Sequence, residues 1–383
     1  MQWFGAIAHG LCHAYMLIFP AILLIMVSDL SADLFRVGVL GNVAYFAFGF
    51  GAIPAGYLAS RFSSRTVVLT FLYGAAITAV ALSFLPSIQA LYAGFLLLGL
   101  FCSLYHPAGL SIIATIKDRG PAMAYHGVSG NLAIAFAPLL FGTVGMYGGW
   151  RGAYRVAGIA GIALAFLAHR ITFDMPHEER PSAEKQGGRF AEEGRGIHLA
   201  LLYLIVALNG FIYRGVLTFL PSWFAEAGGS NLAQAGLVTS LALTLGIAGQ
   251  VFGGRVYRTG FPERSLLFLG IVALPLLAWI GRLPLATSGV IAAAFLFVHF
   301  ATQPVTNSLV AQYTRSGKRS IGYGFSFFLG FGTGSFASSA SGYVARNDGI
   351  AAVFPFLAWF AAGIVVIGSI LAVRAGLHPH VSK

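Results

Sequence analysis

Twelve apolar stretches follow one another along this chain, and each approaches the roughly 20 residues that a helix needs to cross a bilayer. Six of them lie in the first half of the chain, at residues 3–27, 36–59, 66–85, 89–115, 121–147 and 151–171. The other six lie at residues 198–223, 232–256, 263–281, 285–311, 320–344 and 349–373. Because lipid offers no hydrogen bonds to the backbone, such segments satisfy their own backbone groups as helices. The sequence therefore predicts an all-α integral membrane fold, with twelve transmembrane helices in two six-helix halves.

The charge content agrees with a chain whose surface faces lipid. Only 9% of the 383 residues are charged and 57% are hydrophobic, whereas a soluble domain is about 25% charged. The net charge of +11 does not indicate a nucleic-acid partner, because the basic residues form short clusters between apolar stretches. That pattern is typical of loops on the cytoplasmic side of a membrane.

A polar segment separates the two halves. Residues 174–197 contain half of the twelve acidic residues and almost no large apolar side chains, so they are expected to form a solvated cytoplasmic linker. The predicted domains are therefore an N-terminal bundle at 1–173, the linker at 174–197 and a C-terminal bundle at 198–383. Most Lys and Arg residues follow even-numbered spans, which predicts a multi-pass protein of the inner (plasma) membrane with both termini in the cytoplasm.

The two halves repeat each other at a shift of about 200 residues. His13 lies seven residues before Pro20 in the first span, and Arg214 lies seven residues before Pro221 in the seventh. The fourth and tenth spans likewise carry His106-Pro and Gln303-Pro. Parallel repeats of this kind are typical of transporters that bind their solute between two halves.

The loop after the second span resembles the pattern of the major facilitator superfamily. It carries Gly56, Leu58, Arg61 and Arg65, with Ser60 in place of the Asp of the family, and Gly-Trp-Arg at 149–151 is also typical of the family. The resemblance covers essentially the whole chain. It implies the twelve-helix facilitator fold and a cytoplasmic gate, for which the candidate residues here are Ser60, Arg61, Arg65, Arg255 and Arg258.

A narrower likeness concerns the sequences LYHPAG in the fourth span and TFLP after Arg214. They resemble the fosmidomycin-resistance branch, which is associated with phosphonate efflux. Organic-anion exchangers similar to oxalate–formate transporters are a second resemblance. The antiporter motif of the family is matched only in part, by Gly130, Pro138 and Gly142, so the motif does not predict export.

Ionisable residues inside the spans indicate the chemistry, because a charge in lipid is expensive and usually faces a polar cavity. All Asp and Glu residues are expected in loops or in the linker, which argues against transport of a cation. Arg214, in contrast, lies in the middle of the seventh span. Its planar fork suits a carboxylate or a phosphonate, so direct binding of an anion is predicted. The alternative is a structural Arg that bonds helix carbonyls.

Histidines are the titratable groups expected beside Arg214. His13 is its counterpart in the repeat, and His13 and His106 are predicted to contact the solute. If protons drive transport, His13, His106 and His126 are the expected carriers, because histidine titrates near neutral pH. His9, Cys12 and His13 suggest a soft-metal site, but without carboxylates and with Arg214 opposite, no metal is expected.

Neutral side chains are predicted to complete the solute site with hydrogen bonds. Besides Arg214, His13 and His106, the candidate substrate-binding residues are Gln303, Asn307, Tyr15, Tyr213 and Asn131. Gln303 and Asn307 lie one turn apart on one helix face, and Gln303-Pro is expected to repeat the geometry of His106-Pro.

These observations predict a secondary active transporter of a small organic anion, of the carboxylate or phosphonate type, that works by alternating access. A fixed buried cation favours an anion exchanger, which is a kind of antiporter. The protein would close around this charge only when the solute is bound. The alternative is proton-driven efflux of multiple amphipathic drug-like compounds. No enzyme activity is expected, since the spans lack a nucleophile–base–acid set. The expected partners are the anionic solute, the bilayer, and protons or a counter-anion; no cofactor is expected, and the default assembly is a monomer.

Overall fold

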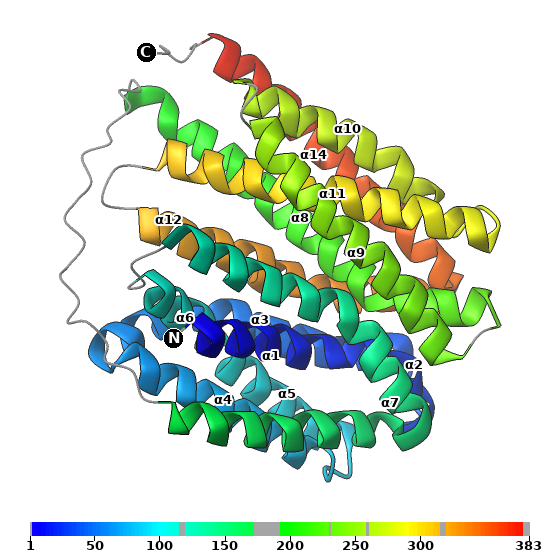
Figure 1. The fold of residues 1–383 in the computed structure, drawn as a ribbon. Helices are drawn as coiled ribbons and strands as arrows, with labels where there is room; N and C mark the ends of the chain where they lie inside the picture. Colours follow the sequence, from blue (N-terminus) through cyan, green and yellow to red (C-terminus); the bar gives the residue numbers. More distant parts are fainter. Residues whose placement is uncertain are drawn as a thin grey trace.

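The computed structural model describes residues 2–114, 119–171, 192–229, 231–257, 260–314 and 319–377, and these are helical almost throughout (Figure 1). The first half of the chain forms α1 (Gln2–Ala21), α2 (Leu23–Asp29), α3 (Leu34–Arg61), α4 (Ser64–Leu82), α5 (Ile88–Ser103), α6 (Tyr105–Ala114) and α7 (Arg119–Arg170). We refer to α1–α7 as the N-terminal half.

The second half of the chain forms α8 (Glu192–Ala227), α9 (Leu232–Tyr257), α10 (Pro262–Trp279), α11 (Leu285–Tyr313), α12 (Arg319–Phe327), η1 (Phe328–Gly332), η2 (Thr333–Phe336), α13 (Ala337–Asp348), η3 (Ile350–Ala352) and α14 (Val353–Leu377). We refer to α8–α14 as the C-terminal half. Helix α8 begins at Glu192, inside the segment expected to be linker, so the helix starts earlier than predicted.

All twelve predicted spans are found as helices, although the helix labels do not correspond one to one to the spans. Ten helical stretches are long and apolar enough to cross a membrane, and one of them, Tyr125–Arg170, has 46 residues and contains two predicted spans. Gly149 separates these two spans with φ 65°, a conformation that favours glycine. The remaining span is divided among α12, η1, η2 and α13.

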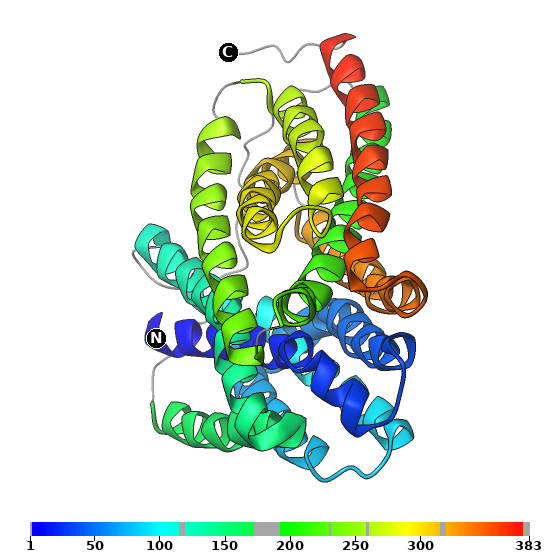
Figure 2. The ribbon, with the colours of Figure 1, turned by 90° about the vertical axis from the view of Figure 1, so that its right-hand side faces the viewer.

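The N-terminal half and the C-terminal half form two groups of helices that pack on each other (Figure 2). Helix α7 packs on α9, and α3 packs on α13, η1 and η2. We call the end of the molecule at which Arg170 and Glu192 lie the linker side, and the opposite end, which contains Asp29 and Asp348, the far side.

Glycines close the interface between the halves on the far side. A Cβ atom added at Gly38 would lie 2.5 Å from the carbonyl oxygen of Ser338, and one at Gly142 would lie 2.6 Å from that of Leu232. The first pair joins α3 to α13 and the second joins α7 to α9. Because no larger residue fits at these crossings, the halves meet there backbone to backbone.

Toward the linker side, four glycines of these helices and of α12 have no close neighbour. A Cβ atom added at Gly56, Gly127, Gly254 or Gly324 would find no described atom within 4 Å. Helix α12 still contacts α3, where the ring centroids of Phe327 and Phe48 lie 5.4 Å apart. The close backbone contacts at Gly38 and Gly142 therefore lie on the far side.

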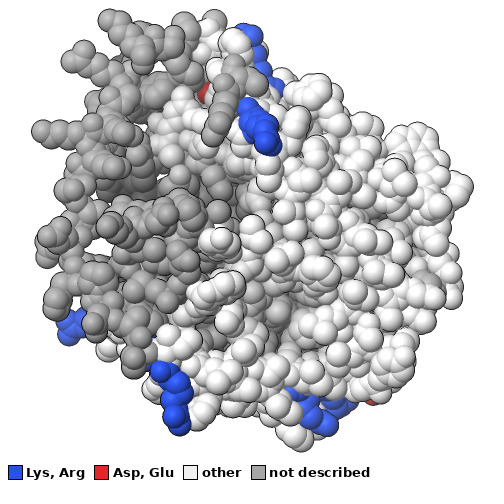
Figure 3. All heavy atoms as spheres, in the orientation of Figure 1, with Lys and Arg blue, Asp and Glu red and all other residues white. Residues whose placement is uncertain are grey.

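The outer surface has the character expected of a chain embedded in lipid. On the face in Figure 3, most of the described surface carries neither basic nor acidic side chains, and the visible Lys and Arg atoms gather toward its upper and lower margins. Large apolar side chains such as Trp359 and Val290 are 79% and 70% exposed, which is stable against lipid but not against water.

Candidate functional site

Arg214 lies at the centre of the interface between the halves. Along α8 it is about 20 Å from the far end of the helix at Ala227, given the helical rise. Its guanidinium carbon is 3.2 Å from the centroid of the Tyr45 ring on α3, and the Tyr45 hydroxyl donates to the carbonyl of Met16. The cation of one half therefore rests on an aromatic face that the other half holds in place.

The charge of Arg214 is buried and incompletely paired. The residue is 4% exposed, and its Nη1 has no hydrogen-bond partner among the described residues. The ion pairs found within the described residues lie elsewhere, at Asp29 and Asp33. A buried cation without a counter-charge is strongly destabilising, so this position favours the arrival of an anion.

Four histidines gather in the N-terminal half next to Arg214. The His9 ring stacks on His126 with centroids 3.9 Å apart, and His106 lies 5.3 Å from both His9 and His13 by ring centroids. His13 interacts electrostatically with Arg214. The structure thus brings His13, His106 and His126 together as a site, and adds His9 to it.

Hydrogen bonds fix the tautomers of three of these rings. Nδ1 of His9 lies 2.7 Å from the carbonyl oxygen of His126 and donates to it, so Nε2 of neutral His9 is an acceptor. Nε2 of His13, 3.1 Å away, donates to that acceptor. Tyr105 donates to the carbonyl of Gly5 at 2.5 Å and accepts from Nδ1 of His126 at 3.2 Å. The proton-coupling role of His13, His106 and His126 stays a prediction.

A break in the fourth span turns His106 toward the other histidines. Helix α5 ends at Ser103 and α6 begins at Tyr105, so His106 and Pro107 lie in the first turn of α6, where proline is tolerated because its missing N–H has no partner to lose. Pro304, in contrast, lies inside the continuous helix α11. The expectation that Gln303-Pro repeats the geometry of His106-Pro is therefore wrong.

A chain of three amides crosses the interface beside the histidines. Asn131 of α7 donates to Gln250 of α9 at 2.5 Å, and Gln250 donates to Gln303 of α11 at 2.9 Å. Gln303 and Asn307 are exposed on one face of α11, as their spacing predicted. The predicted residues Asn131 and Gln303 are thus linked through Gln250, which the sequence analysis did not select.

The two predicted tyrosines lie in different places. Tyr213 stacks on His299 with centroids 5.3 Å apart in the C-terminal half and lies 6.0 Å from Arg214, so it adjoins the site. Tyr15 is 1% exposed and donates to the carbonyl of Ala157 at 3.3 Å. The Tyr15 hydroxyl is therefore directed into the interior of the N-terminal half, and the structure does not bring it to Arg214.

The predicted gate residues are only partly described. Arg258 and the side chain of Ser60 lie outside the described residues, while Arg61 and Arg255 are exposed on the linker side. Arg65 donates to the carbonyls of His169 at 2.9 Å and Ile171 at 3.3 Å, at the end of α7. Arg65 thus caps a helix of its own half, and a gate formed by these residues stays a prediction.

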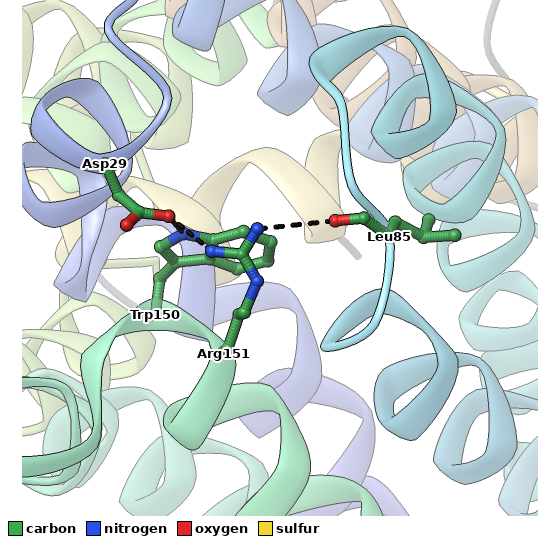
Figure 4. A network of polar contacts seen from close by, with 4 residues as sticks. All are labelled: Asp29, Leu85, Trp150 and Arg151. Atoms are coloured by element: carbon green, nitrogen blue, oxygen red, sulfur yellow. Dashed lines mark hydrogen bonds and ion pairs between the residues drawn. The ribbon is translucent and has the colours of Figure 1, made fainter.

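Charged networks hold the far side together. Oδ2 of Asp29 accepts from the Trp150 indole at 2.6 Å and from Arg151, which also reaches the carbonyl of Leu85 (Figure 4). The Trp150 indole N–H, and after it the Arg151 guanidinium, hold the pKa of the Asp29 carboxyl below its usual value. The Gly-Trp-Arg sequence therefore ties the start of the sixth span to the end of the first.

A second far-side network joins the two halves. Asp33 begins α3 and lies 3.5 Å from Arg346 at the end of α13, and Asn42 donates to Ser339 at 2.5 Å. The backbone N–H of Arg36 and the nearby charge of Arg346 lower the pKa of the Asp33 carboxyl. These contacts, which the sequence analysis did not predict, reinforce the closed far side.

One carboxylate departs from the expectation that all acids lie in loops. Glu263 is 5% exposed in the first turn of α10 and accepts a hydrogen bond from Tyr313 of α11. The negative charge sits at a helix N-terminus, where the helix dipole favours it. Glu263 lies at the linker-side end of its span, so it does not pair with Arg214.

Sequence reasoning missed Gln250, Tyr45 and the Asp33–Arg346 pair. Gln250 is a polar residue inside an apolar span, and the reasoning that selected Asn131 would also have selected it. Tyr45 carries no signal, because its role comes only from the packing of α3 on α8. Asp33 and Arg346 are distant in sequence, and their pairing follows only from the meeting of α3 and α13.

Comparison with known proteins gives the family of the chain. The family model of the Major Facilitator Superfamily matches residues 3–339. Among curated relatives, the chain is 27% identical to the "Probable galactarate/D-glucarate transporter GudP" of Bacillus subtilis, over 60% of this chain and 57% of that protein. It is 25% identical to the "Probable galactarate/D-glucarate transporter GarP" of Escherichia coli, over 59% of each. The chain thus spans less than two thirds of the length of these relatives.

A third relative, the "Probable sulfoacetate transporter SauU" of Cupriavidus necator, is 25% identical over 69% of this chain and 68% of that protein. Among solved structures, an inward-facing, occupied bacterial homologue of the human lysosomal transporter Spinster has a TM-score of 0.77 at 15% identity, covering 98% of this chain and 96% of that one. A D-xylose–proton symporter has a TM-score of 0.76 at 15% identity, covering 99% and 97%. The predicted twelve-helix fold is confirmed.

Proposed function

The chain belongs to the major facilitator superfamily, and from this premise we propose that it transports a small organic anion of the carboxylate type, with Arg214 as the anion-binding cation. The observation that carries the proposal is the burial of Arg214 at 4% exposure, with Nη1 unpartnered among the described residues. A carboxylate that accepts from Nη1 removes the cost of that unpaired charge.

The relatives support a carboxylate in preference to a phosphonate. GudP and GarP are named as transporters of galactarate and D-glucarate, which are dicarboxylic sugar acids, and SauU is named as a transporter of sulfoacetate. These are small, strongly acidic and hydrophilic solutes. A buried guanidinium suits an acid of this kind better than the apolar drug that an efflux pump would carry.

The amide chain supports a solute that also carries hydroxyl groups. Asn131, Gln250 and Gln303 present both donors and acceptors where α7 meets α9 and α11. A polyhydroxy acid can exchange hydrogen bonds with such amides while its carboxylate meets the guanidinium. We therefore assign hydroxyl recognition to Asn131, Gln250, Gln303 and the neighbouring Asn307.

Alternating access is the mechanism that this interface supports. The halves meet through Gly38 and Gly142 on the far side, and the glycines of the same helices stand free on the linker side. Rocking of one half against the other would open the far side and close the linker side. Because basic residues cluster on the linker side, we place that side, with both termini, in the cytoplasm.

Thermal stabilisation of the purified protein tests the proposal. We expect the melting temperature to rise with the concentration of galactarate, glucarate or sulfoacetate, because a ligand that binds only the folded state stabilises it. Succinate, methylphosphonate and galactose serve as comparison solutes, because they lack hydroxyls, carboxylate or charge respectively. Arg214→Ala should abolish the shift, and exposed Arg282→Ala should retain it. Stabilisation by amphipathic cations, equally in wild type and Arg214→Ala, would contradict the proposal and favour drug efflux.

A further inference from the structure

The histidine cluster next to Arg214 offers a set of metal ligands. Ligand nitrogens of His9, His13 and His106 all lie within 4.8 Å of one another. The sequence suggests a soft-metal site at His9, Cys12 and His13, although no metal is expected there from sequence alone. The structure replaces Cys12 with His106, because the Cys12 thiol is fully buried and donates to the carbonyl of Cys102 at 3.4 Å.

We propose that His9, His13 and His106 bind a divalent transition-metal ion of the Zn²⁺ type, with a fourth position open to water or an anionic ligand. Three imidazoles with an open position form a common zinc site, and imidazole suits Zn²⁺, Ni²⁺ and Cu²⁺ in preference to Mg²⁺ or Ca²⁺. The proposal does not depend on the proposed transport of an organic anion.

The distances require only small side-chain adjustments. Two nitrogens bound to one tetrahedral Zn²⁺ lie about 3.4 Å apart, since each Zn–N bond is about 2.0–2.1 Å. Nε2 of His9 and Nε2 of His13 are already 3.1 Å apart. His106 comes from the first turn of α6, and Nδ1 of its ring is buried without a hydrogen-bond partner among the described residues. That nitrogen is available as the third ligand.

The surroundings orient the ligands as metal sites require. Nδ1 of His9 donates to the carbonyl of His126, which leaves the Nε2 lone pair directed into the cluster. Zinc-binding histidines are commonly oriented by such a hydrogen bond from the other ring nitrogen. On metal binding, the proton that His13 places between the two Nε2 atoms would move to Nδ1 of His13. The rings of Phe48 and Phe327, 5.5 Å and 5.0 Å from His106, form an apolar shell on the side of the interface.

Arg214 sets the electrostatic balance of the site. It interacts with His13 and therefore repels a cation bound there. Removing this charge should tighten metal binding, because two positive charges repel each other and water screens them poorly in the interior. The Arg214→Ala variant should therefore bind metal at least severalfold more tightly than wild type, which a metal bound at exposed histidines elsewhere would not do.

The test is titration of the full chain, free of any polyhistidine tag and stripped with chelator, with CoCl₂ and then with competing ZnCl₂. We expect one Co²⁺ per chain, with the visible absorption of tetrahedral cobalt, displaced by Zn²⁺. His13→Ala and His106→Gln should each lose this absorption, and Arg214→Ala should gain affinity. The exposed His169→Ala variant is the matched control and should bind as wild type does. Circular dichroism of each variant without metal verifies that it folds. If one of the two histidine variants fails to fold, the other still tests the site.

The proposal would be overturned by a wild-type chain without the tetrahedral spectrum, or by a spectrum that persists in both His13→Ala and His106→Gln. Loss in His169→Ala would equally overturn it, because the metal would then lie at the surface. These outcomes are independent of the anion experiment: metal binding without anion stabilisation refutes only the proposed function, and the reverse refutes only the metal site.

Discussion

The guanidinium carbon of Arg214 on α8 lies 3.2 Å from the centroid of the Tyr45 ring on α3, so a buried cation of one half rests on an aromatic ring of the other. Tyr45 belongs to the N-terminal half and is itself fixed through its hydroxyl to Met16 of α1. Any movement of one half against the other must change this contact, which links the position of the cation to the conformation of the protein.

Two substitutions at Tyr45 should distinguish the contribution of its ring to stability from that of its hydroxyl. Tyr45→Phe loses one hydrogen bond, worth about 1 kcal/mol of unfolding free energy, whereas Tyr45→Leu also loses a cation–π contact worth about 2 kcal/mol when desolvated. We expect Tyr45→Leu to melt at a lower temperature than Tyr45→Phe. In an Arg214→Ala background the difference should shrink, and an unchanged difference would show that the ring does not stabilise the cation.

The close approach at Gly49 should control closure of the far side. A Cβ atom there would clash with the backbone of Gly332 in η1, so Gly49→Ala should separate α3 from the C-terminal half. Disulfide formation between Asn42→Cys and Ser339→Cys, whose side chains now hydrogen-bond at 2.5 Å, measures this separation. We expect Gly49→Ala to reduce the disulfide yield. Gly56→Ala in the same helix meets no described atom within 4 Å and should leave the yield unchanged.

Gln250 is expected to contribute to solute affinity. Gln250→Leu leaves Asn131 and Gln303 without their bridging amide and, under the proposed function, removes a hydrogen bond to a solute hydroxyl worth about 0.5–1.5 kcal/mol. The KM for a hydroxylated acid should therefore rise about tenfold, whereas that for an acid without hydroxyls should change less. Gln234→Leu makes the same chemical change at the exposed far end of α9, and an equal KM change in that variant would argue against a direct role.

Asp29 gives a pH-dependent prediction outside the membrane. Its pKa is lowered in the folded state by the Trp150 indole and then by Arg151. Its stabilising contribution is therefore present above the usual carboxyl pKa of about 3.9 and is lost as the pH falls through the lowered value. Because the pair is partly exposed, we expect at most about 1 kcal/mol.

The measurement is the melting temperature of Asp29→Asn from pH 7 to pH 3. The difference from wild type should be largest at pH 7 and should narrow below about pH 4. Asp348→Asn, at the exposed end of α13, serves as the matched control. A difference that grows on acidification would show that the sign of the linkage is wrong.

Helix positions and the buried cation could be predicted from sequence because both follow from local chemistry. Apolar length defines a span, and a charge such as Arg214 inside it implies a cavity. The repeat also related His13 to Arg214, and the two residues interact electrostatically in the structure. The repeat did not predict that α11 continues through Pro304 while the fourth span breaks before Pro107. That difference depends on tertiary packing, because a proline in a membrane helix either kinks or breaks it according to its neighbours.

The composition of the histidine cluster could be predicted only in part. His13, His106 and His126 were selected because they are titratable and fall inside the predicted spans, but the direction of each ring depends on helix rotation, which a sequence defines poorly. The same uncertainty explains Tyr15, whose hydroxyl bonds Ala157 inside its own half. Contacts such as Asp33–Arg346 and Arg214–Tyr45 join distant helices and depend on how the halves meet. Neither contact could therefore be predicted from the sequence.

The most direct test of the account is solute counterflow in proteoliposomes, with the labelled anion that stabilises the purified protein. Losing a charged hydrogen bond worth about 1.5–3 kcal/mol should lower the rate about 10- to 100-fold in Arg214→Ala. Arg214→Lys should restore part of the rate, and Arg282→Ala should transport as wild type does. Arg214→Ala that folds and exchanges the anion at the wild-type rate would contradict the claim that Arg214 binds the solute.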